Sequence, residues 1–139
     1  MYLLDTNVIS ERRKGTKADL GVRRFFTRAQ TEAARLYLSA ITIGELRRGV
    51  ELIRHRGDAA QADLLEDWLQ EVSRDYQAQI LAFDAEAAQV WGRLRVPCPE
   101  NALDKQIAAT AWVYDLTLVT RNTSDFADTG LRVINPFSD

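Results

Sequence analysis

The sequence predicts a three-layer α/β/α domain, in which helices cover both faces of a central parallel sheet of four to five strands. Short apolar runs without polar alternation are typical of strands buried on both faces. These runs alternate along the chain with longer segments of helical periodicity. Strands that alternate with helices form parallel sheets through right-handed crossovers. No repeat, low-complexity segment or linker divides residues 1–139, so we expect a single domain.

The first strand is predicted at residues 2–4, where the run Tyr2-Leu3-Leu4 ends at Asp5. The run is too short for a helix and shows no polar alternation. The other predicted strands are similar short apolar runs, the last of them at the edge of the sheet. They are residues 36–39, 80–83, 116–120 and 131–134.

The predicted helices fill the segments between these strands and end at turn residues. Gly57-Asp58 separates two long helices, Asp84 is a favourable N-cap, and Pro97-Cys98-Pro99 is a rigid break. The predicted helices are residues 7–13, 18–30, 42–56, 59–76, 85–95 and 102–114. Apolar residues expected to point inward from the second and fourth of them are Leu20, Phe25, Phe26, Leu64, Leu65, Trp68, Leu69 and Val72.

The composition, 46% apolar and 27% charged, is that of a globular domain, and it excludes several kinds of site. Cys98 is the only cysteine and His55 the only histidine. Intramolecular disulfides, histidine- or cysteine-rich metal sites and a Ser-His-Asp triad are therefore excluded, and only oxygen ligands could hold a metal. No run approaches a transmembrane length and the chain starts with a predicted strand, so we expect a cytoplasmic protein without membrane contact.

Charge is distributed unevenly along the chain. Residues 1–56 carry 12 Lys and Arg against 6 Asp and Glu, a balance of +6, whereas residues 57–139 carry 6 against 14, a balance of −8. A basic half can bind a phosphate backbone, although solvated helix faces would carry the same charges without any partner. The basic half is rich in arginine, whose planar guanidinium suits phosphates, and this favours nucleic-acid binding.

Two acidic residues are predicted near the carboxyl edge of the sheet, where ligands bind in open α/β folds. Asp5 ends the first strand. Glu45 follows Thr42 by three residues, and this pair fits a capping box, in which the glutamate only satisfies a backbone donor. Alternatively, Glu45 shares a helix face with Gly49 and Leu52 that borders the buried stripe. The sequence leaves both interpretations of Glu45 open.

Asp104 is more informative. It lies three residues after the expected cap Asn101, where the helix dipole favours a negative charge. On the helical wheel it falls among Ile107, Ala108 and Ala111, the face that must turn toward the sheet. An isolated buried charge is strongly unfavourable, so an inward carboxylate needs a partner. An acid that bends out to solvent is the alternative, but the short aspartate stem favours a functional role.

The polar segment after the fourth predicted strand offers Thr120, Asn122 and Asp125 at the same edge as Asp5, although many polar turns look similar. All four acids are then expected on one side of the sheet. Crowded carboxylates retain protons unless a cation is present. With oxygen ligands alone, that cation would be Mg²⁺ or Mn²⁺, which activates water in phosphodiester cleavage. The set predicts a metal-dependent nuclease.

Five stretches in order resemble one known family. They are LLDTN at 3–7, SAITIGELRRG at 39–49, LDKQIAATA at 103–111, LVTRNTSDF at 118–126 and VINPF at 133–137. Together they span essentially the whole chain and resemble PIN-domain ribonucleases of the VapC/FitB toxin type. The resemblance implies an endoribonuclease that inhibits translation by cutting structured RNA such as tRNA. It also implies a co-expressed antitoxin that inserts a segment into the acidic pocket, and a homodimer or a toxin–antitoxin hetero-oligomer.

Residue by residue, Asp5, Glu45 and Asp104 match the acids of this family. Some relatives carry an aspartate where Asn122 stands, and we assign the fourth acidic position to Asp125, with Asn122 or its backbone positioning the metal or its water. Thr6 and Thr120 resemble the supporting hydroxyl residues of the family.

On this basis we assign each acid an expected role. Asp5 and Asp104 are expected to hold the principal Mg²⁺, directly or through water, with Mn²⁺ able to replace it. Glu45 and Asp125 would complete the negative pocket, and both one ion and two are compatible with this set.

Three other functions share parts of this sequence pattern. A phosphatase of the haloacid-dehalogenase type also places an aspartate after its first strand, but it requires a second aspartate where this chain has Asn7. A PIN-fold nuclease with an RNA-processing or repair role is a closer alternative. A non-catalytic RNA- or protein-binding module on the same fold typically lacks one or more of the acids, and here all three matched acids are present.

Overall fold

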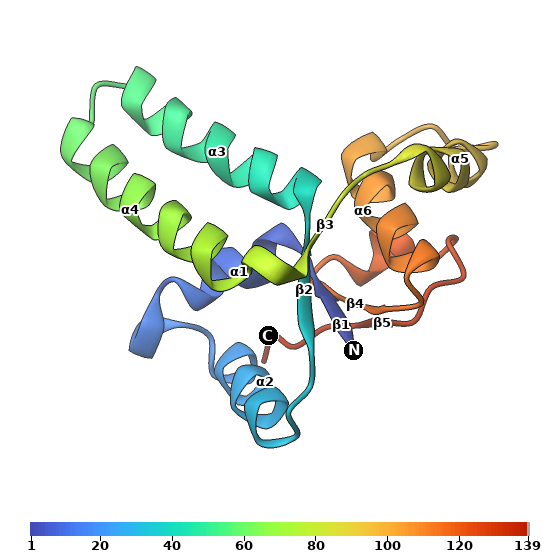
Figure 1. Ribbon diagram of the computed structural model, residues 1–139, viewed down its shortest axis with the longest axis horizontal. Helices are drawn as coiled ribbons and strands as arrows, with labels where there is room; N and C mark the ends of the chain where they lie inside the picture. Colours follow the sequence, from blue (N-terminus) through green and yellow to red (C-terminus); the bar gives the residue numbers. More distant parts are fainter. Residues whose placement is uncertain (139) are drawn as a thin grey trace.

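The computed structural model describes residues 1–138 and shows the predicted parallel sheet (Figure 1). The strand order is β3-β2-β1-β4-β5, and every pairing is parallel. The carboxyl ends of the strands therefore lie at one edge, with β1 at the centre and, as predicted, β5 at the margin. The strands are β1 (Tyr2–Leu4), β2 (Leu36–Ser39), β3 (Ile80–Leu81), β4 (Thr117–Val119) and β5 (Val133–Ile134).

Helices follow the strands in the predicted order. The six α-helices of the described residues are α1 (Thr6–Arg12), α2 (Leu20–Thr31), α3 (Ala40–His55), α4 (Ala59–Asp75), α5 (Ala85–Leu94) and α6 (Ala102–Val113). Short 3₁₀ turns are η1 (Gly15–Lys17), η2 (Gln77–Gln79) and η3 (Thr123–Phe126). None of the helices within residues 1–138 is long and apolar enough to cross a membrane.

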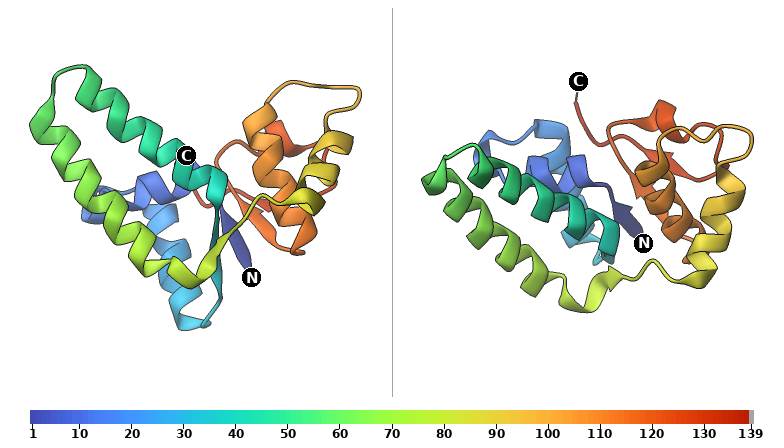
Figure 2. Two further views of the ribbon diagram at one scale, coloured as in Figure 1. Left: turned by 45° about the horizontal axis from the view of Figure 1, so that its top comes forward. Right: turned by 90° about the horizontal axis from the view of Figure 1, so that it is seen from above.

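Alternate strand residues face two separate cores, which gives the three layers (Figure 2). Leu4, Leu38 and Val119 pack with apolar residues of α1, α2, α3 and α4. On the other face, Leu3 and Leu118 pack with α6. The side chains that continue each of these rows beyond the ends of the strands are therefore placed on opposite faces of the sheet.

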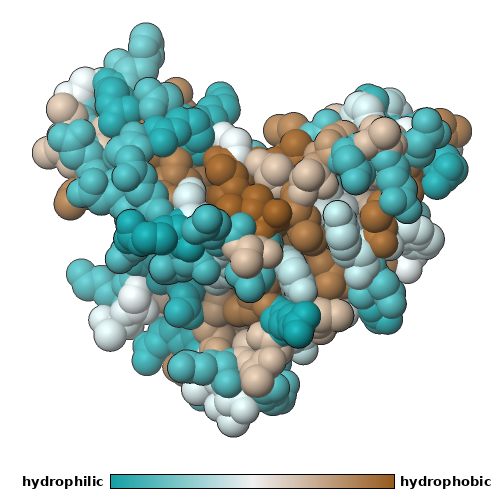
Figure 3. All heavy atoms as spheres, in the orientation of Figure 1, coloured by the Kyte–Doolittle hydropathy of each residue, from teal (hydrophilic) through white to brown (hydrophobic). Residues whose placement is uncertain are grey.

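Two pairs of helices diverge from the sheet. Figures 1 and 2 show the hairpin of α3 and α4 on one side and the pair of α5 and α6 on the other. Arg47 of α3 connects the two helices of the hairpin, because its Nη1 and Nη2 donate to the two carboxylate oxygens of Glu66 in α4 at 2.6 and 2.7 Å. Figure 3 shows hydrophilic residues over the outer sides of both pairs and apolar residues in the hollow between them.

Some expected details of the helices are wrong. Leu64 is 66% exposed, because α4 packs on α3 through the narrower stripe of Ala62, Leu65, Leu69 and Val72. Leu20, the first residue of α2, is also exposed. Phe25 and Phe26 are buried as expected.

Candidate active site

Asp5 lies directly after β1, where it is both the cap of α1 and a buried carboxylate. Its side chain is almost fully buried at 3% exposure. Oδ1 accepts a hydrogen bond from the backbone N–H of Thr6 at 2.7 Å, and Oδ2 accepts one from the Thr120 hydroxyl at 2.7 Å. Burial raises the pKa of Asp5, the two hydrogen bonds oppose that shift, and the nearby charge of Asp125 adds to it.

Thr120 and Asn7 hold Asp5 in place. The Thr120 hydroxyl donates to Asp5 and accepts from the Asn7 amide at 3.3 Å and from the backbone N–H of Asn122 at 3.1 Å, so its full bonding capacity is used. Asn7 also lies 3.4 Å from Asp5 Oδ2, and its own oxygen accepts the backbone N–H of Arg121 at 3.1 Å. Asn7 was not among the predicted site residues, although its place two residues after Asp5 was the available signal.

Glu45 reaches this network through a threonine. Thr6 Oγ1 donates to Glu45 Oε1 at 2.8 Å and lies 3.2 Å from Oγ1 of the buried Thr42. The capping-box interpretation of Glu45 is wrong, because α3 begins at Ala40 and its N-cap is Ser39, whose hydroxyl accepts from the backbone N–H of Ile41. Glu45 therefore stands within the helix and faces the end of β1.

Asp104 lies in the first turn of α6, opposite the end of the central strand. Asn101 occupies the N-cap position in a left-handed conformation with φ of 57°, but its side chain makes no capping hydrogen bond. The pKa of Asp104 is raised to about 6, first by burial and then by the charges of Asp5, Asp125 and Glu45. The four predicted acids therefore share one electrostatic environment.

Asp125 and Asn122 come from the turn after β4. Asp125 lies in η3, half-buried, and its backbone N–H donates to the carbonyl of Asn122. Its charge raises the pKa of both Asp5 and Asp104. Asn122 is exposed and contributes through its backbone N–H, which donates to Thr120.

Within residues 1–138, no lysine or arginine forms a salt bridge with any of the four carboxylates. The buried Lys105 next to Asp104 donates instead to the carbonyl of Cys98 and lies 4.0 Å from Asp128. The negative charge of the cluster is thus not compensated by side chains of the described residues, which is a reason for a cation to bind there.

The donor set fits Mg²⁺ in chemistry, with one restriction on geometry. All the donors are oxygen atoms, which Mg²⁺ prefers. Among residues 1–138, however, no three acidic, histidine or cysteine side chains are arranged to hold one ion together. Mg²⁺ usually keeps several waters and takes only one or two carboxylates together with substrate phosphates. The cluster fits that mode of binding better than a closed cage of carboxylates.

Comparison with known proteins places this geometry in a family. The family model described as the PIN domain matches residues 2–131. The chain is 34% identical to "Toxin FitB" of Neisseria gonorrhoeae over the full length of both chains. It is also 34% identical to "VapC ribonuclease Y4jK" of Sinorhizobium fredii, covering 99% of this chain and 98% of that protein.

Solved structures agree with the sequence comparison. The crystal structure of FitAcB from Neisseria gonorrhoeae contains a chain with a TM-score of 0.85, 34% identity and coverage of 98% of both chains. A DNA-bound VapBC from Salmonella typhimurium contains a chain with a TM-score of 0.71, 25% identity and coverage of 97% of both chains.

Proposed function

The chain belongs to the PIN domain family, and from this we propose that it is a metal-dependent endoribonuclease, the toxin component of a type II toxin–antitoxin pair. Relatives that match over nearly the whole chain are named as a toxin and as a ribonuclease. We further propose that the substrate is structured RNA such as tRNA, whose cleavage would inhibit translation.

The observation that carries this proposal is the polar network at the ends of β1 and β4, in which Asp5 contacts Thr120 and Glu45 contacts Thr6, with no salt bridge to any of the four acids within residues 1–138. Burial and the charges of Asp5, Asp125 and Glu45 also raise the pKa of Asp104 to about 6. Such a cluster is electrostatically unfavourable unless it binds a cation. An acidic cluster at the carboxyl edge of a parallel sheet is suited to binding a divalent metal and a phosphodiester.

In the proposed mechanism, each acid keeps the role that the resemblance implies. Asp5 and Asp104 would hold Mg²⁺, directly or through water, and Mn²⁺ could replace it. Thr120 and Asn7 orient Asp5 through their hydrogen bonds, and Thr6 orients Glu45. When bound, the ion would supply an activated water and stabilise the negative charge that develops during cleavage.

Glu45 and Asp125 add negative charge to the cluster and would accept hydrogen bonds from water held beside a bound ion. Asp125 is able to do this because its carboxylate makes no salt bridge within residues 1–138. Thr120 receives the backbone N–H of Asn122, so Asn122 supports the site through its main chain.

We also propose that a cognate antitoxin binds this chain and inserts a segment into the acidic pocket. The FitAcB and VapBC structures that it resembles are toxin–antitoxin complexes by their names, and one such VapBC complex is bound to DNA. A homodimer or a toxin–antitoxin hetero-oligomer is the proposed assembly.

The test is a cleavage assay on protein purified free of antitoxin. Total tRNA is incubated with the wild type and with Asp5→Asn, in Mg²⁺, in Mn²⁺ and in EDTA. We expect discrete fragments only with the wild type and a divalent metal. Cleavage that persists in EDTA or in the variant would exclude the proposed site, and absence of cleavage across a panel of RNAs would contradict the nuclease function.

A further inference from the structure

We propose that Arg121 is a phosphate-binding residue, which holds the RNA where it leaves the acidic pocket on the side of α1 and α2. This inference rests on the proposed nuclease function and deepens it, because it assigns a backbone contact next to the scissile phosphate. Neither the predicted site nor the resemblance gives Arg121 a role.

The backbone of Arg121 is fixed by the same network that orients Asp5. Its N–H donates to Asn7 Oδ1 at 3.1 Å, and Asn7 in turn contacts both Asp5 and Thr120. The residues on both sides take part as well, because the N–H of Asn122 donates to Thr120. A side chain that starts at this position is therefore held beside the acidic cluster without belonging to it.

The alternation along β4 determines the side on which Arg121 lies. Leu118 faces the core beneath α6, and Thr120, two residues later, continues that row and contacts Asp5. Val119 faces the other core, and Arg121 continues its row. The guanidinium is accordingly found 4.8 Å from the ring centroid of Phe137, a residue that packs against the core of α1 and α2.

The ring of Phe137 holds the guanidinium in place without neutralising it. Stacking on an aromatic face restricts a flexible arginine but leaves its N–H edge free to donate. Within residues 1–138, no carboxylate lies within 4.0 Å of Arg121, and its side chain is exposed. A planar fork presented in this way is suited to a phosphate, which it can bind through two parallel hydrogen bonds.

The segment that carries Phe137 is itself anchored to α2. The backbone N–H and the hydroxyl of Ser138 donate to the carboxylate of Asp19, at 2.9 and 2.7 Å. Gly21 allows this approach, because a Cβ atom there would lie 2.2 Å from the carbonyl oxygen of Pro136. The fold therefore fixes the position of Phe137, which in turn contacts the Arg121 guanidinium.

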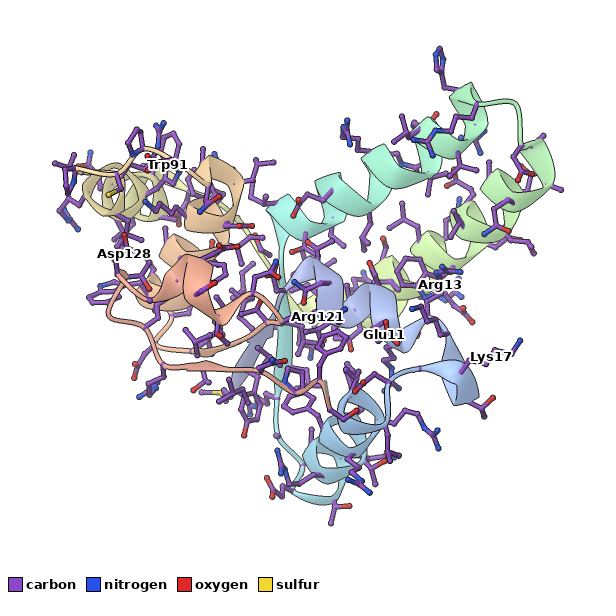
Figure 4. The ribbon with its side chains drawn as sticks, turned by 180° about the vertical axis from the view of Figure 1, so that it is seen from behind. Glu11, Arg13, Lys17, Trp91, Arg121 and Asp128 are labelled. Atoms are coloured by element: carbon purple, nitrogen blue, oxygen red, sulfur yellow. The ribbon has the colours of Figure 1, made fainter. Side chains whose placement is uncertain are left out.

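The surroundings of Arg121 favour a polyanion. Figure 4 shows Arg121 beside α1, with Glu11 next to it and Arg13 and Lys17 further along the same part of the molecule. Glu11 is paired with Lys14 at 2.9 Å. Arg12, in the last turn of α1, stacks on Phe26 at 4.2 Å and forms no salt bridge within the described residues. A nucleic acid that runs from the acidic pocket past Arg121 would meet this basic surface next.

The test measures RNA binding without cleavage. In the Asp5→Asn background, the affinity for labelled tRNA is measured over a series of salt concentrations for Arg121→Gln, Arg121→Lys and Phe137→Leu. Arg132→Gln is the matched control, because this substitution removes the same charge at the amino end of β5, away from the acidic cluster. Arg132 pairs there with Asp115. Thermal unfolding of each variant identifies any loss of fold.

We expect Arg121→Gln to weaken binding by about tenfold and to reduce the salt slope by about 0.7 to 0.9, the value of one phosphate contact. Arg121→Lys should keep the slope and lose part of the affinity, because a lysine lacks the fork. Phe137→Leu should behave in the same way, because the charge remains but its position is less restricted. Arg132→Gln should bind as the Asp5→Asn background does.

Two results would overturn the inference. One is an unchanged affinity and salt slope for a folded Arg121→Gln variant. The other is an unchanged RNA affinity together with weaker binding of an antitoxin, which would assign Arg121 to a protein partner. Failure of the proposed function is distinguishable, since the wild type would then neither cleave nor bind RNA, whatever residue stands at position 121.

Discussion

Asp5 has more hydrogen-bond partners than the other three acids, and its environment shows why a buried carboxylate in an acidic cluster costs stability. The Asp5 side chain accepts hydrogen bonds from Thr6 and Thr120, and the Asn7 amide lies within 3.4 Å of it. These bonds only partly offset burial, because the pKa of Asp5 is still raised. A carboxylate in this position is unfavourable for the protein alone and becomes favourable when a cation is bound.

Replacing Asp5 by asparagine separates the cost of the buried carboxylate for stability from its contribution to metal-dependent cleavage. Asp5→Asn should reduce RNA cleavage by about a thousandfold or more, since several kcal/mol of charge stabilisation by the metal are lost. The same variant should fold normally and should be as stable as the wild type, or more stable, in EDTA. Cleavage rates and thermal unfolding in EDTA check both parts, and an unfolded or fully active variant would contradict them.

The raised pKa of Asp104 predicts how the stability of the fold depends on pH. Its pKa is about 6 in the folded protein and 3.8 ordinarily, so the folded state holds the proton more tightly. Stability should therefore fall as pH rises from about 4 to about 6 in EDTA, and Asp104→Asn should reduce that fall. The thermal midpoint is measured against pH for both proteins. Equal slopes for the two would show that Asp104 is not perturbed in this way.

Cys98 should be dispensable for cleavage. Its thiol is exposed, and its contact with Lys105 is made through the backbone carbonyl, which Cys98→Ser keeps. We expect Cys98→Ser to retain wild-type cleavage and thermal stability. Loss of activity in a folded variant would show that the mechanism does not depend on metal and carboxylates alone.

At the scale of elements, the sequence pattern predicted the order and type of the strands and α-helices of residues 1–138, but it did not predict the details that depend on packing. The predicted start of α3 at Thr42 was wrong, because the helix begins directly after β2, at Ala40, with Ser39 as its N-cap. Leu64 is exposed because α4 buries Ala62, Leu69 and Val72 instead, and this choice depends on packing that the local sequence does not contain. The polar turn η3 was expected only as a loop, since its residues carry no helical pattern.

Part of the candidate site was predictable from the parallel topology of the sheet. Parallel topology alone brings Asp5 and Thr120 to the same edge, and these two are in direct contact. The contact of Thr6 with Glu45 and the bridging role of Asn7 depend on side-chain rotamers and on the positions of the helices, which the sequence pattern does not specify. The roles of the four acids in binding metal and in catalysis stay predictions until measured.

The contact between α2 and the C-terminal segment is tested with a pair of glycine variants. Gly21→Ala should destabilise the fold by about 1 to 3 kcal/mol, because the added methyl group would clash with the backbone at Pro136. Gly49→Ala, within α3 and with open space around it, should stabilise the fold by about 0.5 to 1 kcal/mol. Denaturant unfolding of both checks this, and a stabilised Gly21→Ala variant would mean that the segment is not docked as described.

At the scale of the whole molecule, charge is divided between two parts of the chain. The first 56 residues carry a balance of +6, to which Arg12, Arg13 and Lys17 contribute, and supply Asp5 and Glu45. The rest carries −8 and supplies two of the four acids, Asp104 and Asp125. The acidic cluster lies where these two parts meet, so a negatively charged substrate would approach along the basic part and reach the acids only with a cation present.

The most direct test of the metal-dependent site is a calorimetric titration of the antitoxin-free protein with Mn²⁺, at a pH above the Asp104 pKa of about 6. Asp5→Asn and Asp104→Asn are titrated in parallel, and the thermal midpoint is measured with and without the ion. We predict that the wild type binds Mn²⁺ and is stabilised by it, and that each variant loses most of both effects. Wild-type protein that does not bind Mn²⁺, or variants that bind it as tightly, would contradict the assignment of this acidic cluster as a metal-dependent catalytic centre.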